Sequence, residues 1–169
     1  MQRHIISLLV EDNPGVLARI SGMFTRRGIN ITSLTVSPCE KAGLSRMTVV
    51  IDGSERELEQ VRKQLNNLVE VLHAKELRGD FVVRDLCLLH VAAKNAEQRA
   101  EIMQIASSYG AKVADATLNS LILELADEPQ KIDRFVELMR HFGIKQLFRS
   151  GICAIASSLS HIFHCGRVV

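Results

Sequence analysis

Apolar residues recur along this chain in two rhythms, one typical of strands and one typical of helices. In the first half, runs rich in Ile, Leu and Val predict four strands, over residues 3–10, 30–38, 45–52 and 69–77. Between them, apolar residues three or four positions apart predict two helices, each with a buried stripe. The stripes consist of Val16, Leu17, Ile20, Met23 and Phe24, and of Leu58, Val61, Leu65 and Leu68.

Turn and cap residues predict where these two helices begin and end. The first helix is expected to start after the turn over residues 12–15 and to end at Gly28 as its C-cap. Ser54 is expected to cap the second helix, with Glu57 three residues later as its capping-box partner.

The same order of elements returns after a short polar linker over residues 79–82. Strands are predicted over 83–93, 112–117, 120–126 and 144–148, and helices over 97–109 and from Pro129 onward. Each half therefore has the order βαββαβ, the ferredoxin-like motif.

The predicted fold class is α+β, with two ferredoxin-like βαββαβ domains whose antiparallel sheets carry helices on one face. The domains are expected to cover residues 1–78 and 83–158, and residues 159–169 to form a tail. A sheet with one bare face and free edges favours pairing with another domain or subunit.

Composition narrows the function classes. The 169 residues carry a net charge of only +2 and 4% aromatic residues, which argues against nucleic acid as a partner. No apolar run approaches the roughly 20 residues that span a bilayer, and no secretory signal is recognisable, so no membrane partner is expected. Cys39, Cys87, Cys153 and Cys165 form no CxxC pair, which favours reduced thiols in a cytoplasmic protein.

The first strand–helix junction carries the candidate chemistry. Gly15 is placed at a helix N-terminus, where free backbone N–H groups and the helix dipole attract a carboxylate. Asp12, just before, could accept a hydrogen bond from an ammonium group. An amino acid carries both groups and fits such a site. The alternative is an ordinary capped turn, the commonest use of such residues.

Longer strings extend this junction into a family pattern. LLVEDNPGVLARISGMFTRRGINITSLTV is followed by LSRMTVVIDG and EQVRKQLNNLVEV. Within them are F-x-x-R-G-x-N-I over residues 24–31, S-L-T-V over 33–36 and L-S-R-M-T over 44–48. The chain resembles the small subunit of acetohydroxyacid synthase (acetolactate synthase), with an N-terminal ACT domain. In the second half the resemblance depends on residues 84–86, 142–144 and 150–151.

The resemblance implies an effector site between two ACT domains that pair edge to edge in a homodimer. The loop of one chain would hold the amino acid, while the start of the second strand of the neighbouring chain closes the pocket. Valine is the expected effector, and leucine and isoleucine remain alternatives because one methylene is worth only about 1–3 kcal/mol. The implied effector residues are Asp12, Asn13, Pro14, Gly15, Val16, Leu17, Asn30 and Ile31.

The resemblance also implies partners and a pathway. The chain would be a non-catalytic regulatory subunit in branched-chain amino acid biosynthesis, which binds valine for feedback inhibition and stimulates a large catalytic subunit. Thiamine diphosphate, Mg²⁺ and FAD are expected in that large subunit, and no cofactor in this chain. The second domain lacks the D-x-P-G string, so no conventional effector site is predicted there.

Two departures from the family pattern stand out. The family often has Asn where this chain has Asp12, which adds a negative charge to the predicted pocket. Near the end, Ser158 takes the place of the usual Gly, and the residues after it match no family string.

Other features of the sequence allow other interpretations. His161, His164 and Cys165 have metal-ligand spacing, but no second cluster would complete a tetrahedral site, so no metal is predicted. A small enzyme on a ferredoxin-like scaffold is an alternative that no acid–base constellation supports. A free-standing ACT protein that senses an amino acid and regulates another enzyme is a second alternative. His90 is expected to be packed or exposed rather than catalytic. Arg46 is left open between a partner contact and an outward-facing strand residue.

Overall fold

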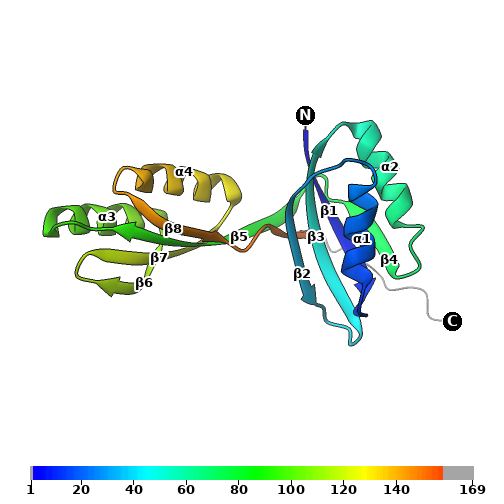
Figure 1. Cartoon of the computed structure of the whole chain (residues 1–169), viewed down its shortest axis with the longest axis horizontal. Helices are drawn as coiled ribbons and strands as arrows, with labels where there is room; N and C mark the ends of the chain where they lie inside the picture. The colour runs from blue at the N-terminus through cyan, green and yellow to red at the C-terminus, as the bar shows by residue number, and fades with distance from the viewer. Residues whose placement is uncertain (1, 158–169) are drawn as a thin grey trace. The chain divides into compact units, whose positions relative to one another are not determined.

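The first sheet is centred on β1 (Gln2–Glu11), which pairs antiparallel with β3 (Leu44–Gly53) on one side and β4 (Val71–Glu76) on the other. Adding β2 (Ile31–Pro38) beside β3 gives the order β2-β3-β1-β4 (Figure 1). The coordinates are a computed structural model, which describes residues 2–157.

Helices α1 (Val16–Thr25) and α2 (Glu55–Leu65) supply the other half of the first core. Their apolar stripes pack on alternate residues of the strands, and fully burying one such side chain contributes about 1.5–3 kcal/mol. The largest buried side chains include Ile6, Leu8, Ile20, Phe24, Met47, Ile51 and Leu65.

The predicted helix caps are confirmed. Ser54 and Glu57 form the expected capping box, with the Ser54 N–H donating to Glu57 Oε2 at 2.8 Å. The regular turns of α1 end at Thr25, and Gly28 closes the helix as predicted, because its N–H donates to the Thr25 carbonyl at 3.0 Å. Gly28 takes a φ of 66°, and the Ile29 N–H donates to the Phe24 carbonyl at 3.1 Å.

The second sheet repeats this topology. Four of its strands, β5 (Phe81–Ala92), β6 (Lys112–Thr117), β7 (Ser120–Asp127) and β8 (Ile144–Arg149), follow the order β6-β7-β5-β8 with antiparallel neighbours. A fifth strand, β9 (Cys153–Ala156), pairs with β5 off this path. Helices α3 (Ala96–Tyr109) and α4 (Pro129–Arg140) pack on this sheet around Leu89, Ile102, Leu123 and Phe135. The predicted fold class, two ferredoxin-like βαββαβ domains, is confirmed.

The boundaries of the two units differ from the predicted ones. The second unit covers Val83–Gly151, and residues 152–157 belong with the first unit, whereas the sequence predicts one domain over residues 83–158. The predicted linker 79–82 is also shorter, since β5 already begins at Phe81.

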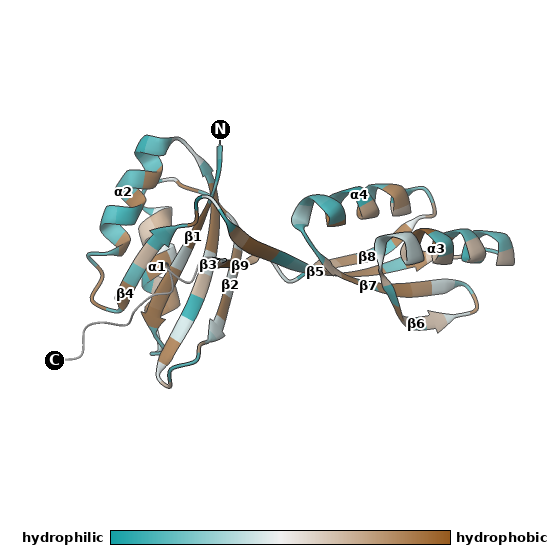
Figure 2. Cartoon of the chain, turned by 180° about the vertical axis from the view of Figure 1, so that it is seen from behind, coloured by the Kyte–Doolittle hydropathy of each residue, from teal (hydrophilic) through white to brown (hydrophobic). Residues whose placement is uncertain are grey.

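A short strand that the sequence did not reveal accounts for this difference. β9 (Cys153–Ala156) contacts β1 and β3 on the sheet face opposite the helices, and Figure 2 labels it beside β2 and β3. Thr48 and Val50 point to that face and are nevertheless buried, with 4% and 1% exposure. The bare face expected from the sequence is therefore partly covered by the chain itself. Ser158 and the predicted tail 159–169, with its histidine pair, lie outside the described residues.

None of the helices that the structure describes is long and apolar enough to cross a membrane.

A buried carboxylate joins both ends of the second unit. Asp85, 3% exposed at the start of β5, accepts from Arg149 Nε at 2.6 Å and from Ser150 Oγ at 3.2 Å. Arg149 also contacts Asp133 of α4. Two of the strings behind the family resemblance, over 84–86 and 150–151, thus lie together in space.

Replacing Arg149 by Met should lower the free energy of unfolding by about 2–3 kcal/mol, because it leaves the buried Asp85 carboxylate without its cation. The matched control is Arg140→Met, which removes an exposed pair with Glu137 and should cost less than about 0.5 kcal/mol. Urea unfolding of both variants measures the difference. Equal losses would mean that the Asp85–Arg149 pair is no stronger than a surface pair.

Cysteine labelling should separate two thiols of similar chemistry. Burial raises the pKa of the Cys87 thiol from 9.0 to about 11, and its side chain is 0% exposed, whereas Cys153 is exposed. At pH 8 we expect iodoacetamide to modify Cys153 in the native chain and Cys87 only after unfolding, because the thiolate is the reactive species. Peptide mass spectrometry reads each site, and comparable native rates would contradict the burial of Cys87.

Candidate functional site

The loop between β1 and α1 is held at both ends by backbone hydrogen bonds. The Asp12 N–H donates to the Gly43 carbonyl at 2.9 Å, which fixes the loop to the β2–β3 turn. Gly15 then precedes the helix with φ 88° and ψ −11°, a left-handed conformation that a glycine adopts without a steric penalty. The Arg19 N–H donates back to the Gly15 carbonyl at 3.0 Å, which closes the first turn of α1.

The N-terminus of α1 keeps its donors available. No side chain caps it, and no acidic residue lies in its first turn. Within residues 2–157, the amide groups of Leu17 and Ala18 have no acceptor, while Val16 donates to the Asn13 carbonyl at 3.3 Å. A Cβ built on Gly15 would meet nothing within 4 Å, so the space in front of these donors is open. The helix dipole adds partial positive charge at the same point.

The side chains of the loop divide into two groups. Asp12, Asn13 and Pro14 are exposed, and Asn13 donates from Nδ2 to Glu11 Oε2 at 2.8 Å. Leu17 is 45% exposed, whereas Val16 is only 5% exposed and packs in the core of its own domain. The predicted buried stripe is therefore confirmed for Val16, whose side chain packs away from solvent. Of the two predicted apolar residues in the loop, only Leu17 faces solvent.

The two predicted halves of the site lie at opposite ends of the sheet within one chain. Ile31 pairs with Ile51, which pairs with His4 at the start of β1, whereas Glu11 at the end of β1 pairs with Leu44. A strand advances about 3.4 Å per residue, so roughly 20 Å separates the start of β2 from the loop. Asn30 is exposed and Ile31 is half-buried against the core. A single chain therefore does not bring Asn30 and Ile31 to the loop.

The comparisons with known proteins give the family. Residues 6–73 match the family model described as AHAS small subunit-like ACT domain, and residues 84–158 match that of the small subunit of acetolactate synthase. A probable acetolactate synthase small subunit of Archaeoglobus fulgidus is 44% identical over 90% of this chain and 96% of its own. The chain belongs to the acetolactate synthase small subunit family.

Further relatives agree over the same length. The acetolactate synthase small subunit of Mycolicibacterium smegmatis is 40% identical over 90% of each chain. The crystal structure of the acetolactate synthase small subunit from Thermotoga maritima superposes with a TM-score of 0.86 at 30% identity, over 94% of this chain and 99% of that one. The second half matches the small-subunit model as well, which argues against the alternative of a free-standing ACT sensor.

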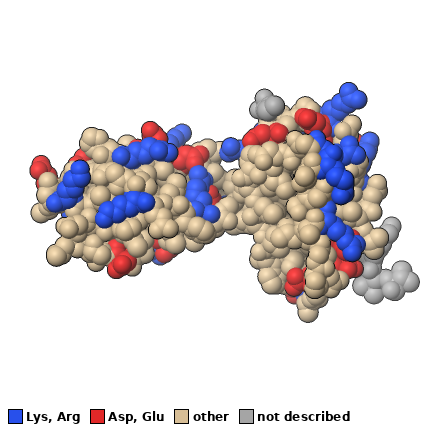
Figure 3. All heavy atoms as spheres, in the orientation of Figure 1, with Lys and Arg blue, Asp and Glu red and all other residues tan. Residues whose placement is uncertain are grey.

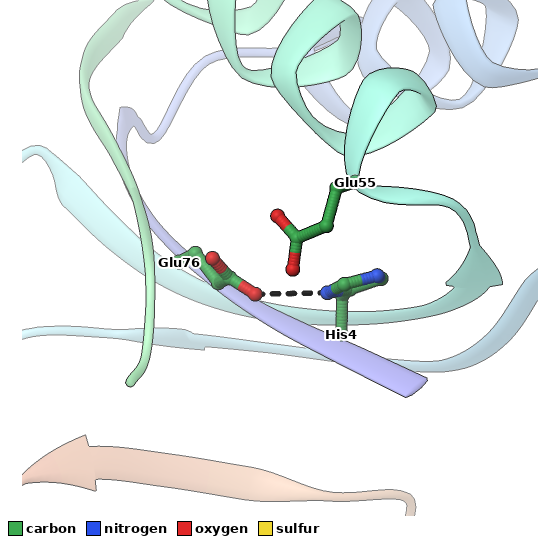
Figure 4. A group of neighbouring side chains, drawn as sticks. All are labelled: His4, Glu55 and Glu76. Carbon is green, nitrogen blue, oxygen red and sulfur yellow. Dashed lines mark hydrogen bonds and ion pairs between the residues drawn. The ribbon is translucent and has the colours of Figure 1, made fainter. Parts of the chain in front are cut away.

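A second polar cluster, which the sequence did not reveal, lies at the opposite end of the first unit. His4 is 1% exposed, and its Nδ1 lies 2.8 Å from Glu76 Oε1 (Figure 4). Glu55, the first residue of α2, completes a group whose possible metal-ligand atoms lie within 4.8 Å of one another. Arg78 contacts both carboxylates, with its Nη2 at 2.5 Å from Glu55 Oε2. A cation already bridges the two acids, so the cluster works as an ion-pair network that joins β1, β4 and α2.

Other polar residues that the sequence left open have structural roles. His90 Nε2 lies 2.9 Å from Ser120 Oγ across β5 and β7. Arg46 faces outward and pairs with Glu40 at 3.2 Å. A hollow of about 470 Å³ beside the end of α1 contains none of the eight predicted effector residues. It is lined by Met23, Arg26, Arg27, Ile29, Glu57, Gln60 and Gln64. Lys and Arg side chains, blue in Figure 3, gather on the part of the first unit that carries α1 and α2.

Replacing Gly15 by Ala should lower the free energy of unfolding by about 1–2 kcal/mol, because a left-handed residue with a Cβ is strained even in open space. Gly15→Asn should cost less, since Asn tolerates this conformation better. Urea unfolding of the full chain measures both. If the Ala and Asn variants were equally stable, the left-handed conformation at Gly15 would not be what requires the glycine.

Proposed function

We propose that this acetolactate synthase small subunit is a regulatory subunit that binds valine at the loop over residues 12–17. Binding there would inhibit the holoenzyme, and the unliganded subunit would stimulate the catalytic large subunit. The observation that carries the proposal is the open N-terminus of α1, where the Leu17 and Ala18 amides have no acceptor in the described chain.

Each part of an amino acid has a counterpart at this loop. The carboxylate would accept from the free amides and be favoured by the helix dipole. The ammonium group would donate to Asp12, whose carboxylate has no hydrogen-bond or ion-pair partner between Gln2 and Ser157. Leu17, 45% exposed, offers an apolar contact to a branched side chain. This chain has Asp12 where the family often has Asn. Asp12 thus adds a negative charge, which an ammonium group requires.

The register of the sheet supports a site shared by two chains. β2 is an edge strand, and its last residue Pro38 pairs with Ser45, at the same end of the sheet as the loop. If β2 pairs antiparallel with β2 of a second copy, the start of the partner strand lies beside Pro38. Asn30 and Ile31 of that copy would then reach the loop that they cannot reach within one chain. A homodimer that pairs through its ACT domains would therefore bring the eight predicted residues together in one site.

Regulation would follow from linkage. Valine inhibits only if it binds the inhibited holoenzyme more tightly than the active one, and the coupling is reciprocal. On this proposal the large subunit carries out the chemistry with thiamine diphosphate, Mg²⁺ and FAD, in the pathway to valine, leucine and isoleucine. The small subunit contributes the effector site and the change in affinity.

Calorimetric titration with valine tests the site. We expect the native chain to bind and Gly15→Asp to bind at least about tenfold more weakly, because its carboxylate occupies the position of the ligand's own carboxylate. Gly15→Asn is the matched control, since it has nearly the same shape, tolerates the same backbone conformation and carries no charge. It should bind more tightly than Gly15→Asp.

Three outcomes count against the proposal. If native and Gly15→Asp chains bind valine equally, the site lies elsewhere. If the native chain binds neither alone nor with the large subunit, valine is not its effector, and parallel titrations with leucine and isoleucine test the alternatives. If Asn and Asp variants lose binding equally, the loss comes from the shape of the side chain and not from its charge.

A further inference from the structure

The chain that returns from the second unit is fastened to the first sheet by side-chain hydroxyl groups. The Ile152 N–H donates to Ser33 Oγ at 2.8 Å, and Thr35 Oγ1 donates to the Ile152 carbonyl at 2.9 Å. The Ala154 N–H donates to Thr48 Oγ1 at 3.4 Å. Residues 152–157, here called the strap, thus satisfy part of their backbone hydrogen bonding on a sheet face.

The position of these hydroxyls has a physical reason. A strand that lies across a sheet face cannot pair with the sheet backbone, whose N–H and C=O groups point within the plane of the sheet. Side chains two residues apart on one strand share a face, so Ser33 and Thr35 can hold both sides of one residue. Thr48 pairs directly with Thr35 in the register of β2 and β3, which completes the group.

Buried and exposed residues alternate along the strap. Ile152 and Ala154 are 7% and 8% exposed, whereas Ile155 is 59% exposed. β9 also pairs with β5, and the Ser157 N–H donates to the Asp80 carbonyl at 3.2 Å just before β5. Loss of the hydroxyls would leave the buried Ile152 N–H and carbonyl unsatisfied, so the attachment at Ile152 depends on them.

The strap follows the second unit along the chain and is hydrogen-bonded close to the proposed effector residues Asn30 and Ile31. On one side it continues from β8 through Gly151, with a φ of 90°, next to the Ser150 hydroxyl that donates to Asp85. On the other side its anchor Ser33 follows Ile31 by two residues. The register of β2 against β3 shifts between Ile31 and Ser33, so an irregularity lies between the proposed effector contact and the anchor. Such bulges redirect neighbouring side chains.

We propose that the strap couples effector occupancy at the start of β2 to the second unit. A ligand that contacts Asn30 and Ile31 biases the bulge, the bulge sets the position of Ser33 and Thr35, and these hydroxyls hold or release residues 152–157. The inference rests on the proposed effector site and adds the element through which that site acts. It also gives the S-L-T-V and L-S-R-M-T strings a role, since they supply the hydroxyls Ser33, Thr35 and Thr48.

The double variant Ser33→Ala/Thr35→Val removes both partners of Ile152 and leaves the proposed effector residues unchanged. The matched control is Ser37→Ala, an exposed serine on the same strand with no hydrogen bond to the described strap residues. Three measurements are made on the full chain with its large subunit: hydrogen exchange of residues 152–157, heat of valine binding, and inhibition of the reconstituted holoenzyme by valine.

In the native chain and in Ser37→Ala, we expect valine to slow exchange of the strap amides. In the double variant the Ile152 amide should exchange at least about tenfold faster without valine, because it loses its hydrogen bond to Ser33 and is left buried and unpaired. Valine should still bind the double variant, but the concentration for half-inhibition should rise at least about tenfold, since the connection between site and second unit is broken.

Each contrary result overturns a distinct claim. Unchanged strap exchange in the double variant shows that the hydroxyls do not fasten the strap. If the double variant exchanges fast but valine inhibits it as it inhibits the native holoenzyme, the strap does not couple the effector site to the second unit. The same conclusion follows if valine binds the native chain without changing the exchange of its strap amides. If valine gives no binding heat with the native chain, alone or in the holoenzyme, the proposed effector is wrong and the coupling fails with it. This result can be told apart from the others, because valine binding is detected in every other outcome.

Discussion

The pairing of β1 between β3 and β4 is the constraint on which the first unit depends. Ile6, Leu8 and Val10 face the helices and are at most 1% exposed, while Ser7 and Leu9 on the other face are also buried. A strand buried on both faces and paired along both edges has one register that satisfies its backbone groups. That register fixes where β1 ends, and the loop over residues 12–17 and the N-terminus of α1 are placed by that end.

The open helix terminus and the distant start of β2 follow from the same sheet. Antiparallel order puts the ends of β1 and β2 at one edge of the unit and the start of β2 at the other. A site that needs both the loop and Asn30 has to take them from different chains. On the proposed function, the geometry of a single ferredoxin-like domain therefore requires pairing of two chains, and ligand binding would then depend on how the subunits are arranged.

The strap changes how the two halves of the chain are related. A sequence with two equal repeats suggests two domains joined by one linker, but the chain crosses between the units at Val82–Val83 and again at Gly151–Ile152. Thr48 and Val50, on the face opposite the helices, are buried in the first unit, which contains the returning strand. Hydroxyl side chains on β2 and β3 help to fix this return, because Ser33, Thr35 and Thr48 form hydrogen bonds with its backbone, and β9 is held as well by its pairing with β5.

The sequence by itself determined the repeated βαββαβ order, the capping box at Ser54 and Glu57, and the family, because these depend on local periodicity and on strings of neighbouring residues. Only the tertiary structure decided that Leu17, expected in the buried stripe, is 45% exposed, that His4, Glu55, Glu76 and Arg78 form one network, and that β9 contacts the first sheet while it pairs with β5. The network and the position of β9 depend on contacts between residues far apart in the chain. β9 has four residues, too short for a recognisable period, and the residue before it is held by side chains at positions 33 and 35.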